Sequence, residues 1–229
     1  MKKYFILIII LILLITGCLR RDPLARIKRL TKVDIQKKEK QSKEYKEAID
    51  TIVDAYRSLG GLNKSIGEYL MINKSYKEAI KHLEIAKDIR NEDATIYYWL
   101  GVCNVNLYKI EGLKEYLSEA EKNYKIALKI MPDHLDILYG YAHLLVYGKN
   151  DYAEAEKVLK KYIELEPVRS KPDPKAYFLL GRVYYLMEDY EKAYETYNKI
   201  LKFKKDLTNK EKNKLDEFIM ESAREMQGE

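Results

Sequence analysis

Small residues recur at regular intervals along this chain, on apolar helical faces where a packed helix normally carries bulkier side chains. Ala193 lies twelve positions after Gly181, and the same spacing separates Gly67 from Ala79. Two antiparallel helices cross closely only where one of the contacting side chains is nearly absent. The spacing therefore predicts paired helices, with Gly on the first helix and Ala on the second.

Two further pairs have the same order with a longer interval, by seven residues between Gly101 and Ala120 and by three between Gly140 and Ala155. The period of the whole pattern is near 34 residues. These residues resemble the tetratricopeptide repeat, a helix-turn-helix unit of that length. The fifth repeat carries the closest resemblance, through Tyr177, Leu180, Gly181, Tyr184, Tyr190, Ala193 and Tyr197.

The resemblance implies an all-α, right-handed helical solenoid over residues 29–207, with four clear repeats and one degenerate N-terminal repeat. In the degenerate repeat, Gln36 stands where the Gly is expected. Its second half matches at Tyr45, Ala48, Ile52 and Ala55. Residues 208–229 are predicted to form a capping helix, because a solenoid needs a cover with a polar outer side.

Boundary signals agree with this organisation. Gly60 and Gly61 predict a break between two helices, and Asp173 before Pro174 predicts a helix start. Asp22 before Pro23 predicts another. Thr208 and Glu211 have the spacing of a capping box. Leu215, Phe218, Ile219 and Ser222 then share one helical face.

Composition supports a helical globular chain, since 47% of the 229 residues are hydrophobic and 34% are charged, with only 10 Gly and 5 Pro. Tyr outnumbers Phe by 21 to 4. Many aromatic rings therefore need one buried end and a hydroxyl near water, which suits thin repetitive packing.

Residues 1–17 have the pattern of a secretory signal peptide, with basic Lys2 and Lys3 followed by an apolar run that is short for a membrane span. The run ends in Ile15, Thr16, Gly17 and Cys18, which resembles the lipobox of bacterial lipoproteins. That resemblance implies cleavage before Cys18 and acylation of Cys18, giving a durable membrane anchor. An uncleaved anchor and an ordinary signal peptide with an incidental cysteine are the alternatives.

Basic charge is concentrated next to the predicted anchor. Removing residues 1–17, whose only charges are Lys2 and Lys3, leaves +4 of the formal +6, and residues 20–46 alone carry a net +7. We therefore interpret residues 18–28 as a basic, membrane-proximal tether that is attracted to anionic head groups, or that is simply solvated. Export would separate the protein from nucleic acid, so a nucleic-acid partner is not expected.

No motif for catalysis, cofactor binding or metal binding is found. His82, His134 and His143 lack the spacing of metal ligands, and the sequence has no Gly-rich phosphate loop and no nucleophile elbow. Cys103 is predicted to be a buried, inert thiol. With Cys18 acylated, no second thiol remains for an intramolecular disulfide. We therefore predict a protein that is not an enzyme and has no cofactor and no metal.

The resemblance also places a binding groove along the first helices, at the positions three before the Gly and one, four and five after it. Mapped onto this chain, the groove residues are Tyr98, Val102, Val105, Asn106, Ile137, Tyr141, Leu144, Leu145, Phe178, Arg182, Tyr185 and Leu186. This lining is apolar and aromatic, and an exposed apolar trough marks a binding site. Alternatively, the third-repeat insertion or the closing helix covers the trough within the same chain.

These features predict a lipid-anchored scaffold in the bacterial cell envelope that binds a protein or peptide partner in its groove. Similar lipidated repeat proteins act in outer-membrane β-barrel assembly, as pilotins for pilus secretins and alongside periplasmic solute transporters. Leu19 stands where some bacteria use Asp for inner-membrane retention, which favours the outer membrane. The alternative function is a carrier or transport-complex subunit that holds a small apolar ligand, or a subunit that oligomerises through the groove.

Overall fold

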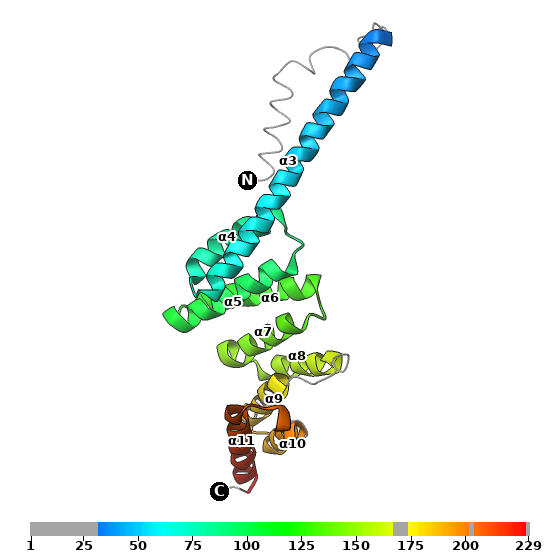
Figure 1. Cartoon of the computed structure of the whole chain (residues 1–229). Helices are drawn as coiled ribbons and strands as arrows, with labels where there is room; N and C mark the ends of the chain where they lie inside the picture. The colour runs from blue at the N-terminus through cyan, green and yellow to red at the C-terminus, as the bar shows by residue number, and fades with distance from the viewer. Residues whose placement is uncertain (1–31, 167–173, 202–203, 228–229) are drawn as a thin grey trace. The chain divides into compact units, whose positions relative to one another are not determined.

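The computed structural model describes residues 32–166, 174–201 and 204–227, and these residues are almost entirely helical (Figure 1). The elements are α3 (Lys32–Ile72), α4 (Tyr76–Ile89), α5 (Ala94–Glu111), α6 (Lys114–Ile130), α7 (Leu135–Leu144), η1 (Leu145–Lys149), α8 (Tyr152–Leu165), α9 (Pro174–Leu186), α10 (Tyr190–Leu201), η3 (Lys204–Asp206) and α11 (Asn209–Gln227). The predicted signal peptide (1–17), the lipidation site Cys18, the tether (18–28) and the start signal at Asp22 lie outside the described residues.

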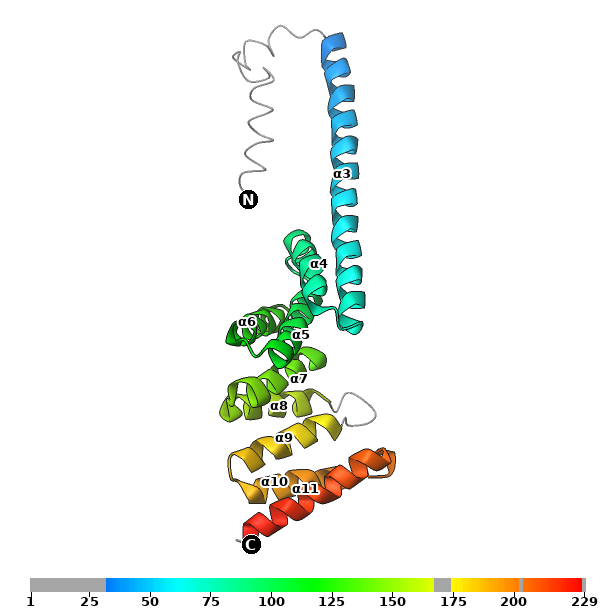
Figure 2. The same ribbon diagram turned by 90° about the vertical axis from the view of Figure 1, so that its left-hand side faces the viewer.

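The chain divides into two compact units, residues 1–55 and 56–229. The described part of the first unit is the N-terminal part of α3. In the second unit, successive helices pack on one another as pairs, α5 with α6, α7 with α8 and α9 with α10 (Figure 2). Together with the end of α3 and α4, these pairs make four repeats, which confirms the predicted all-α helical solenoid.

The turn between the paired helices has the same construction in three repeats. Lys74, Asn150 and Glu188 have positive φ angles of 64°, 53° and 61°, and each lies five residues before the buried Ala of its second helix. In the third repeat, α5 and α6 are longer, with 18 and 17 residues, and Gly112 at φ 73° ends α5. The predicted insertion there has therefore extended both helices of the pair.

This turn residue corrects the predicted register of the fourth repeat. In the second and fifth repeats, the positive-φ residue follows Gly67 and Gly181 by seven residues. In the fourth repeat, it follows Gly140 by ten residues and Ala142 by eight. Ala142 is fully buried, whereas Gly140 is half-buried. Ala142 is therefore the small residue of this repeat, and the prediction that Gly140 has this role was wrong by two positions.

The fourth repeat then holds only one residue more than the second and the fifth. The extra residue is accommodated in η1, a five-residue π-helix that directly continues α7. A π-helical turn is the usual way in which a helix absorbs a single inserted residue. The interval from Gly140 to Ala155 does not show this single insertion, because Gly140 packs against Tyr124 and Tyr98 and not against the second helix of its own repeat.

A large side chain from the second helix occupies the space beside each glycine. A Cβ atom on Gly67 would lie 2.6 Å from Leu83 Cγ, and one on Gly101 would lie 3.0 Å from Tyr124 Cε1. On Gly181 it would lie 2.6 Å from Tyr197 Cζ. A Cβ on Gly140 would also meet Tyr124, which belongs to the preceding repeat. The Ala residues of the second helices, Ala79, Ala120, Ala155 and Ala193, are fully buried.

Helix α3 passes through Gly60 and Gly61 without interruption, so the predicted break at these glycines was wrong. A Cβ on Gly60 would lie 2.7 Å from Ile89 Cγ2, which shows that this glycine allows the end of α4 to approach α3. A further consequence is that the described residues 32–55 do not fold into the helical pair expected of the degenerate first repeat.

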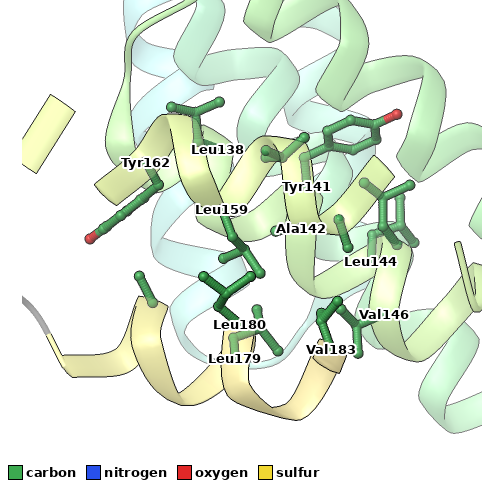
Figure 3. Packing of buried hydrophobic residues seen from close by; sticks show 14 of the residues in the cluster. Leu138, Tyr141, Ala142, Leu144, Val146, Leu159, Tyr162, Leu179, Leu180 and Val183 are labelled. Atoms are coloured by element: carbon green, nitrogen blue, oxygen red, sulfur yellow. The ribbon is translucent and has the colours of Figure 1, made fainter. Parts of the chain in front are cut away.

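Apolar side chains of consecutive repeats form a continuous core in the second unit. Figure 3 shows Leu159 of α8 beside Leu180 of α9, with Leu138, Tyr141 and Ala142 of α7 nearby. A smaller cluster around Leu83, Ile96 and Leu100 joins α4 to α5.

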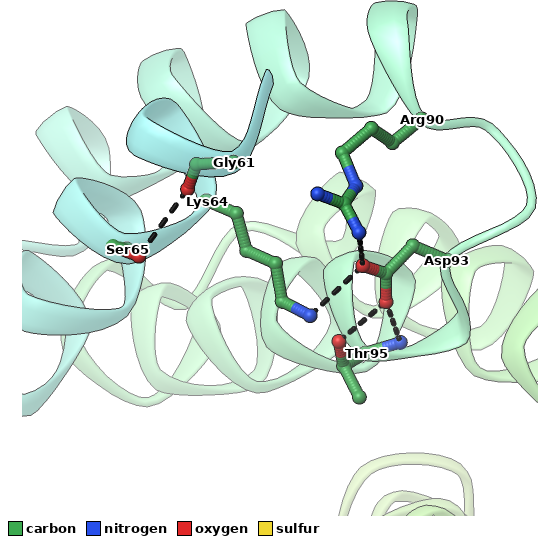
Figure 4. A network of polar contacts seen from close by, with 6 residues as sticks. All are labelled: Gly61, Lys64, Ser65, Arg90, Asp93 and Thr95. Atoms are coloured by element: carbon green, nitrogen blue, oxygen red, sulfur yellow. Dashed lines mark hydrogen bonds and ion pairs between the residues drawn. The ribbon is translucent and has the colours of Figure 1, made fainter. Parts of the chain in front are cut away.

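A polar network links the start of α5 to α3 (Figure 4). Asp93 caps α5 by accepting hydrogen bonds from the backbone N–H and the hydroxyl of Thr95, and Lys64 donates to the same carboxylate at 2.8 Å. Arg90 Nη2 lies 3.6 Å from Asp93 Oδ2. Burial raises the pKa of Asp93, but the hydrogen bonds from Lys64 and Thr95 outweigh this effect and lower the pKa below its usual value.

The closing helix begins as predicted. Thr208 N–H donates to the Glu211 carboxylate at 2.8 Å, and Glu211 N–H donates to the Thr208 hydroxyl at 3.3 Å. Leu215 and Ser222 are fully buried, and Phe218 stacks on Tyr197 with ring centroids 5.2 Å apart. The start of α9 at Pro174 also agrees with the prediction.

The contact between Gly181 and Tyr197 generates a prediction. Gly181→Ala should lower the free energy of unfolding by about 2 kcal/mol, because the added methyl group must displace a buried ring. Tyr197→Leu in the same chain should relieve this overlap, so that the double variant loses at least about 1 kcal/mol less than the two single losses combined.

Urea unfolding followed by circular dichroism measures these values. Gly61→Ala is the control, since its Cβ would meet only Arg90 Nη1 at 3.4 Å, and it should raise stability by about 0.5–1 kcal/mol. Additive losses at Gly181 and Tyr197 would contradict the proposed contact.

Candidate functional site

Most predicted groove residues of the third and fifth repeats lie on the surface of the first helices. Tyr98, Val102 and Asn106 of α5 are half-buried, and Val105 is buried. All four from α9 are half-buried, namely Phe178, Arg182, Tyr185 and Leu186. Seven of these eight side chains therefore reach the surface.

The fourth repeat differs, because its predicted groove residues are part of the core. Ile137 is 0% exposed, Tyr141 5%, and both Leu144 and Leu145 1%. These positions were counted from Gly140, and the two-residue error in register moved them from the surface to the interior. The prediction that these four side chains line an open trough was therefore wrong.

Counting from Ala142 gives Tyr139, His143, Val146 and Tyr147 as the corresponding residues. Val146 is buried, but Tyr139 and His143 are half-buried and Tyr147 is 53% exposed. We refer to the ten surface residues together as the first-helix face. It consists of Tyr98, Val102, Asn106, Tyr139, His143, Tyr147, Phe178, Arg182, Tyr185 and Leu186.

The third, fourth and fifth repeats each contribute one aromatic ring at the position three before the small residue. Tyr98 packs on Trp99 and on Tyr124, with ring centroids 4.7 Å and 6.2 Å apart. Tyr139 packs on Tyr162 and carries the ammonium group of Lys175 over its ring at 5.1 Å. These rings are fixed by their neighbours, and such pre-ordered aromatic surface binds a partner at a low entropic cost.

Helices α5 and α7 bring two parts of the face together. A Cβ on Gly140 of α7 would lie 3.2 Å from Tyr98 Cε2 of α5, so the missing side chain at this glycine lets Tyr98 lie directly against the next helix. Gly140 therefore shapes the face, although it is not the small residue of the helix pair.

His143 lies beside Tyr147, with ring centroids 4.6 Å apart. Burial, together with the positive charge of Lys109, lowers the pKa of His143 to about 4. The imidazole is therefore neutral at pH 7, and it adds an aromatic surface rather than a charge.

The closing helix covers part of the fifth repeat. Phe218 of α11 meets Phe178 edge to face at 6.5 Å. Burial raises the pKa of Tyr185 to about 12, and its hydrogen bond to Glu221 of α11 acts in the same direction. The predicted covering by the chain itself thus applies to Phe178 and Tyr185, and Tyr147 of the fourth repeat remains exposed.

Reactive groups do not gather on this face. Cys103 is fully buried, and burial raises the pKa of its thiol to about 12, so the thiol stays protonated. Within residues 32–166, 174–201 and 204–227, no three His, Cys, Asp or Glu side chains are placed to hold a metal ion. No helix in the described part of the chain has the length and apolar character needed to cross a membrane.

The lowered pKa of His143 predicts a pH effect. Between pH 6.5 and 4 the unfolded chain binds a proton at this residue and the folded chain does not, so stability falls as the pH drops through this range. His143→Gln should reduce that loss by about 1–2 kcal/mol, a discounted figure because solvent partly screens the half-buried ring.

The measurement is urea unfolding at pH 7 and pH 4.5, with His82→Gln as the control. His82 bonds Asn63 at 2.9 Å and should leave the pH-dependent loss in place. An equal loss in the original protein and in His143→Gln would contradict the lowered pKa of His143.

Comparisons with known proteins agree with this geometry. Residues 135–169 and 174–207 match models of the tetratricopeptide repeat. No curated protein matches the sequence significantly.

Similar solved structures include MamA from Desulfovibrio magneticus RS-1, with 21% identity and a TM-score of 0.55 over 75% of this chain and 97% of that one. Pseudomonas aeruginosa PilF has 19% identity and a TM-score of 0.58, over 76% of this chain and 72% of that one. At these identities the similarity concerns the fold alone. The family matches show that the chain contains tetratricopeptide repeats, and the described helices of the second unit form a repeat solenoid.

Proposed function

We propose that this protein is a lipid-anchored, non-catalytic scaffold of the bacterial cell envelope that binds a segment of another protein on its first-helix face. Tetratricopeptide repeats are protein-interaction modules, which supports the class of function. The envelope location and the anchor rest on the sequence of residues 1–18.

One observation carries the binding role, namely the repetition of half-buried aromatic and apolar side chains on successive first helices. Tyr98, Tyr139 and Phe178 stand at equivalent positions in three repeats. Arg182 is the only charged member of the face, and its guanidinium lies over the Tyr185 ring at 5.0 Å. The chemistry suits an apolar, extended or helical segment that carries a carboxylate for Arg182.

The open part of the face lies on α5, α7 and η1, since α11 already contacts Phe178 and Tyr185. Tyr147 is the most exposed aromatic side chain there. An exposed ring among half-buried ones is a good position for the centre of a contact, because its burial by a partner removes a large apolar area from water.

A photo-crosslinking amino acid in place of Tyr147 tests the partner. In intact cells it should trap a specific envelope protein, and purified partner should bind Val102→Glu/Tyr147→Glu at least about 10-fold more weakly, because a carboxylate enters an apolar contact. Ile85→Glu, an exposed apolar residue of α4, is the matched control and should bind normally. Equal weakening by the control would contradict the assignment, and a co-purified small apolar molecule would support the carrier alternative instead.

The anchor has a separate test. Cys18→Ser should abolish incorporation of labelled palmitate and should release the chain from the membrane fraction if the signal peptide is still cleaved. Persistent labelling of the variant would show that Cys18 is not the acylated residue, without bearing on the first-helix face.

A further inference from the structure

Helix α3 carries a continuous stripe of exposed apolar side chains that the first-helix face does not use. The stripe consists of Tyr45, Ile49, Ile52, Tyr56 and Leu59, which are between 46% and 67% exposed. Val53 and Leu62 flank it and are exposed as well. Single exposed apolar residues are common on proteins, but a contiguous series on one helix marks an interaction surface.

The spacing within the stripe points to another helix as its occupant. Successive members are four, three, four and three residues apart, which is the 3.5-residue period of a coiled-coil seam. Ala48 and Ala55 lie seven residues apart along one edge of the stripe. Small residues at that interval let a second helix approach closely.

Tyr45 and Ile52 of the stripe, with Ala48 and Ala55 along its edge, match the second helix of a tetratricopeptide repeat, whose first helix should cover them. Because α3 is one continuous helix from Lys32 to Ile72, the described residues 32–55 do not supply that first helix. The sequence thus keeps a face shaped for a helical neighbour, and the fold leaves that face exposed among the described residues.

Charge argues against a lipid surface as the occupant. Between residues 46 and 59 the helix carries Lys46 and Arg57 against Glu47, Asp50 and Asp54, a net charge of −1. Helices that lie on anionic membranes carry Lys and Arg along the polar face. The basic residues of this chain are concentrated before Lys46, outside the stripe.

The area is sufficient for a specific contact between two copies. Seven half-exposed side chains of this size present on the order of 500–600 Å² per chain. Two copies would bury roughly 1,000 Å² or more, which reaches the range of specific protein interfaces. The contact is self-complementary, since one apolar seam meets another.

We propose that this stripe is a homodimer interface, in which α3 forms a two-helix coil with α3 of a second copy through Tyr45, Ile49, Ile52, Tyr56 and Leu59. Dimerisation would place two first-helix faces on one assembly. It does not depend on the binding role of that face, so either proposal can fail without the other.

The experiment uses the full chain with Cys18→Ser, purified in a non-ionic detergent, with its mass measured by sedimentation over a range of micromolar concentrations. We expect two copies for this protein. Ile49→Asp/Ile52→Asp should raise the dissociation constant at least roughly 100-fold, because four carboxylates would enter the apolar seam. Asp50→Ala/Asp54→Ala, on the opposite face of the same helix, is the matched control and should remain dimeric.

A second measurement is chemical crosslinking, which changes only one residue of the stripe. Ile52→Cys lies in the middle of the stripe and should form a covalent dimer with a short bismaleimide reagent, whereas Asp54→Cys should not. A single-copy mass at all concentrations, a dimer that persists in Ile49→Asp/Ile52→Asp, or equal crosslinking at both positions would each overturn the proposal. So would a single-copy mass combined with binding to phosphatidylglycerol vesicles that only the stripe variant loses.

Discussion

The repeat packing depends on a tyrosine ring or a leucine side chain that occupies the space left by a missing side chain. Tyr197 lies across Gly181 and Tyr124 across Gly101; a Cβ on Gly181 would overlap the ring, and one on Gly101 would press against it at 3.0 Å. The helices of a pair can therefore approach closely while a large aromatic ring is still buried between them. Tyr124 and Tyr197 are 2% and 1% exposed, so each of these two helix pairs buries almost a whole tyrosine.

Much of this arrangement could be predicted from the sequence, because two helices that cross closely need small residues at the crossing, and the spacing of Gly and Ala shows where those residues lie. The second, third and fifth repeats were predicted in the correct register for this reason. In the fourth repeat, Ala142 takes the place of Gly and one residue is inserted after it, while Gly140 lies nearby for a different contact. Residue types and the spacing between them cannot distinguish Gly140 from Ala142, since only the packing shows which of the two faces the paired helix.

Gly60 and Gly61 show the same limit. A glycine pair weakens a helix, and it is also the best way to let another helix come near. The choice between these outcomes depends on Ile89, which is distant in sequence and whose position follows from the packing of α4. Within the candidate site, the third and fifth repeats followed from their register, and the contribution of Tyr139, His143 and Tyr147 became visible only with the corrected register.

The position of Trp99 has a practical consequence. The chain has a single tryptophan, and its ring is 4.7 Å from Tyr98 at one end of the first-helix face. Indole emission responds to the polarity of its surroundings, and no second indole contributes a background. Occupancy of this end of the face can therefore be followed by intrinsic fluorescence, with the unlabelled protein serving as its own optical sensor.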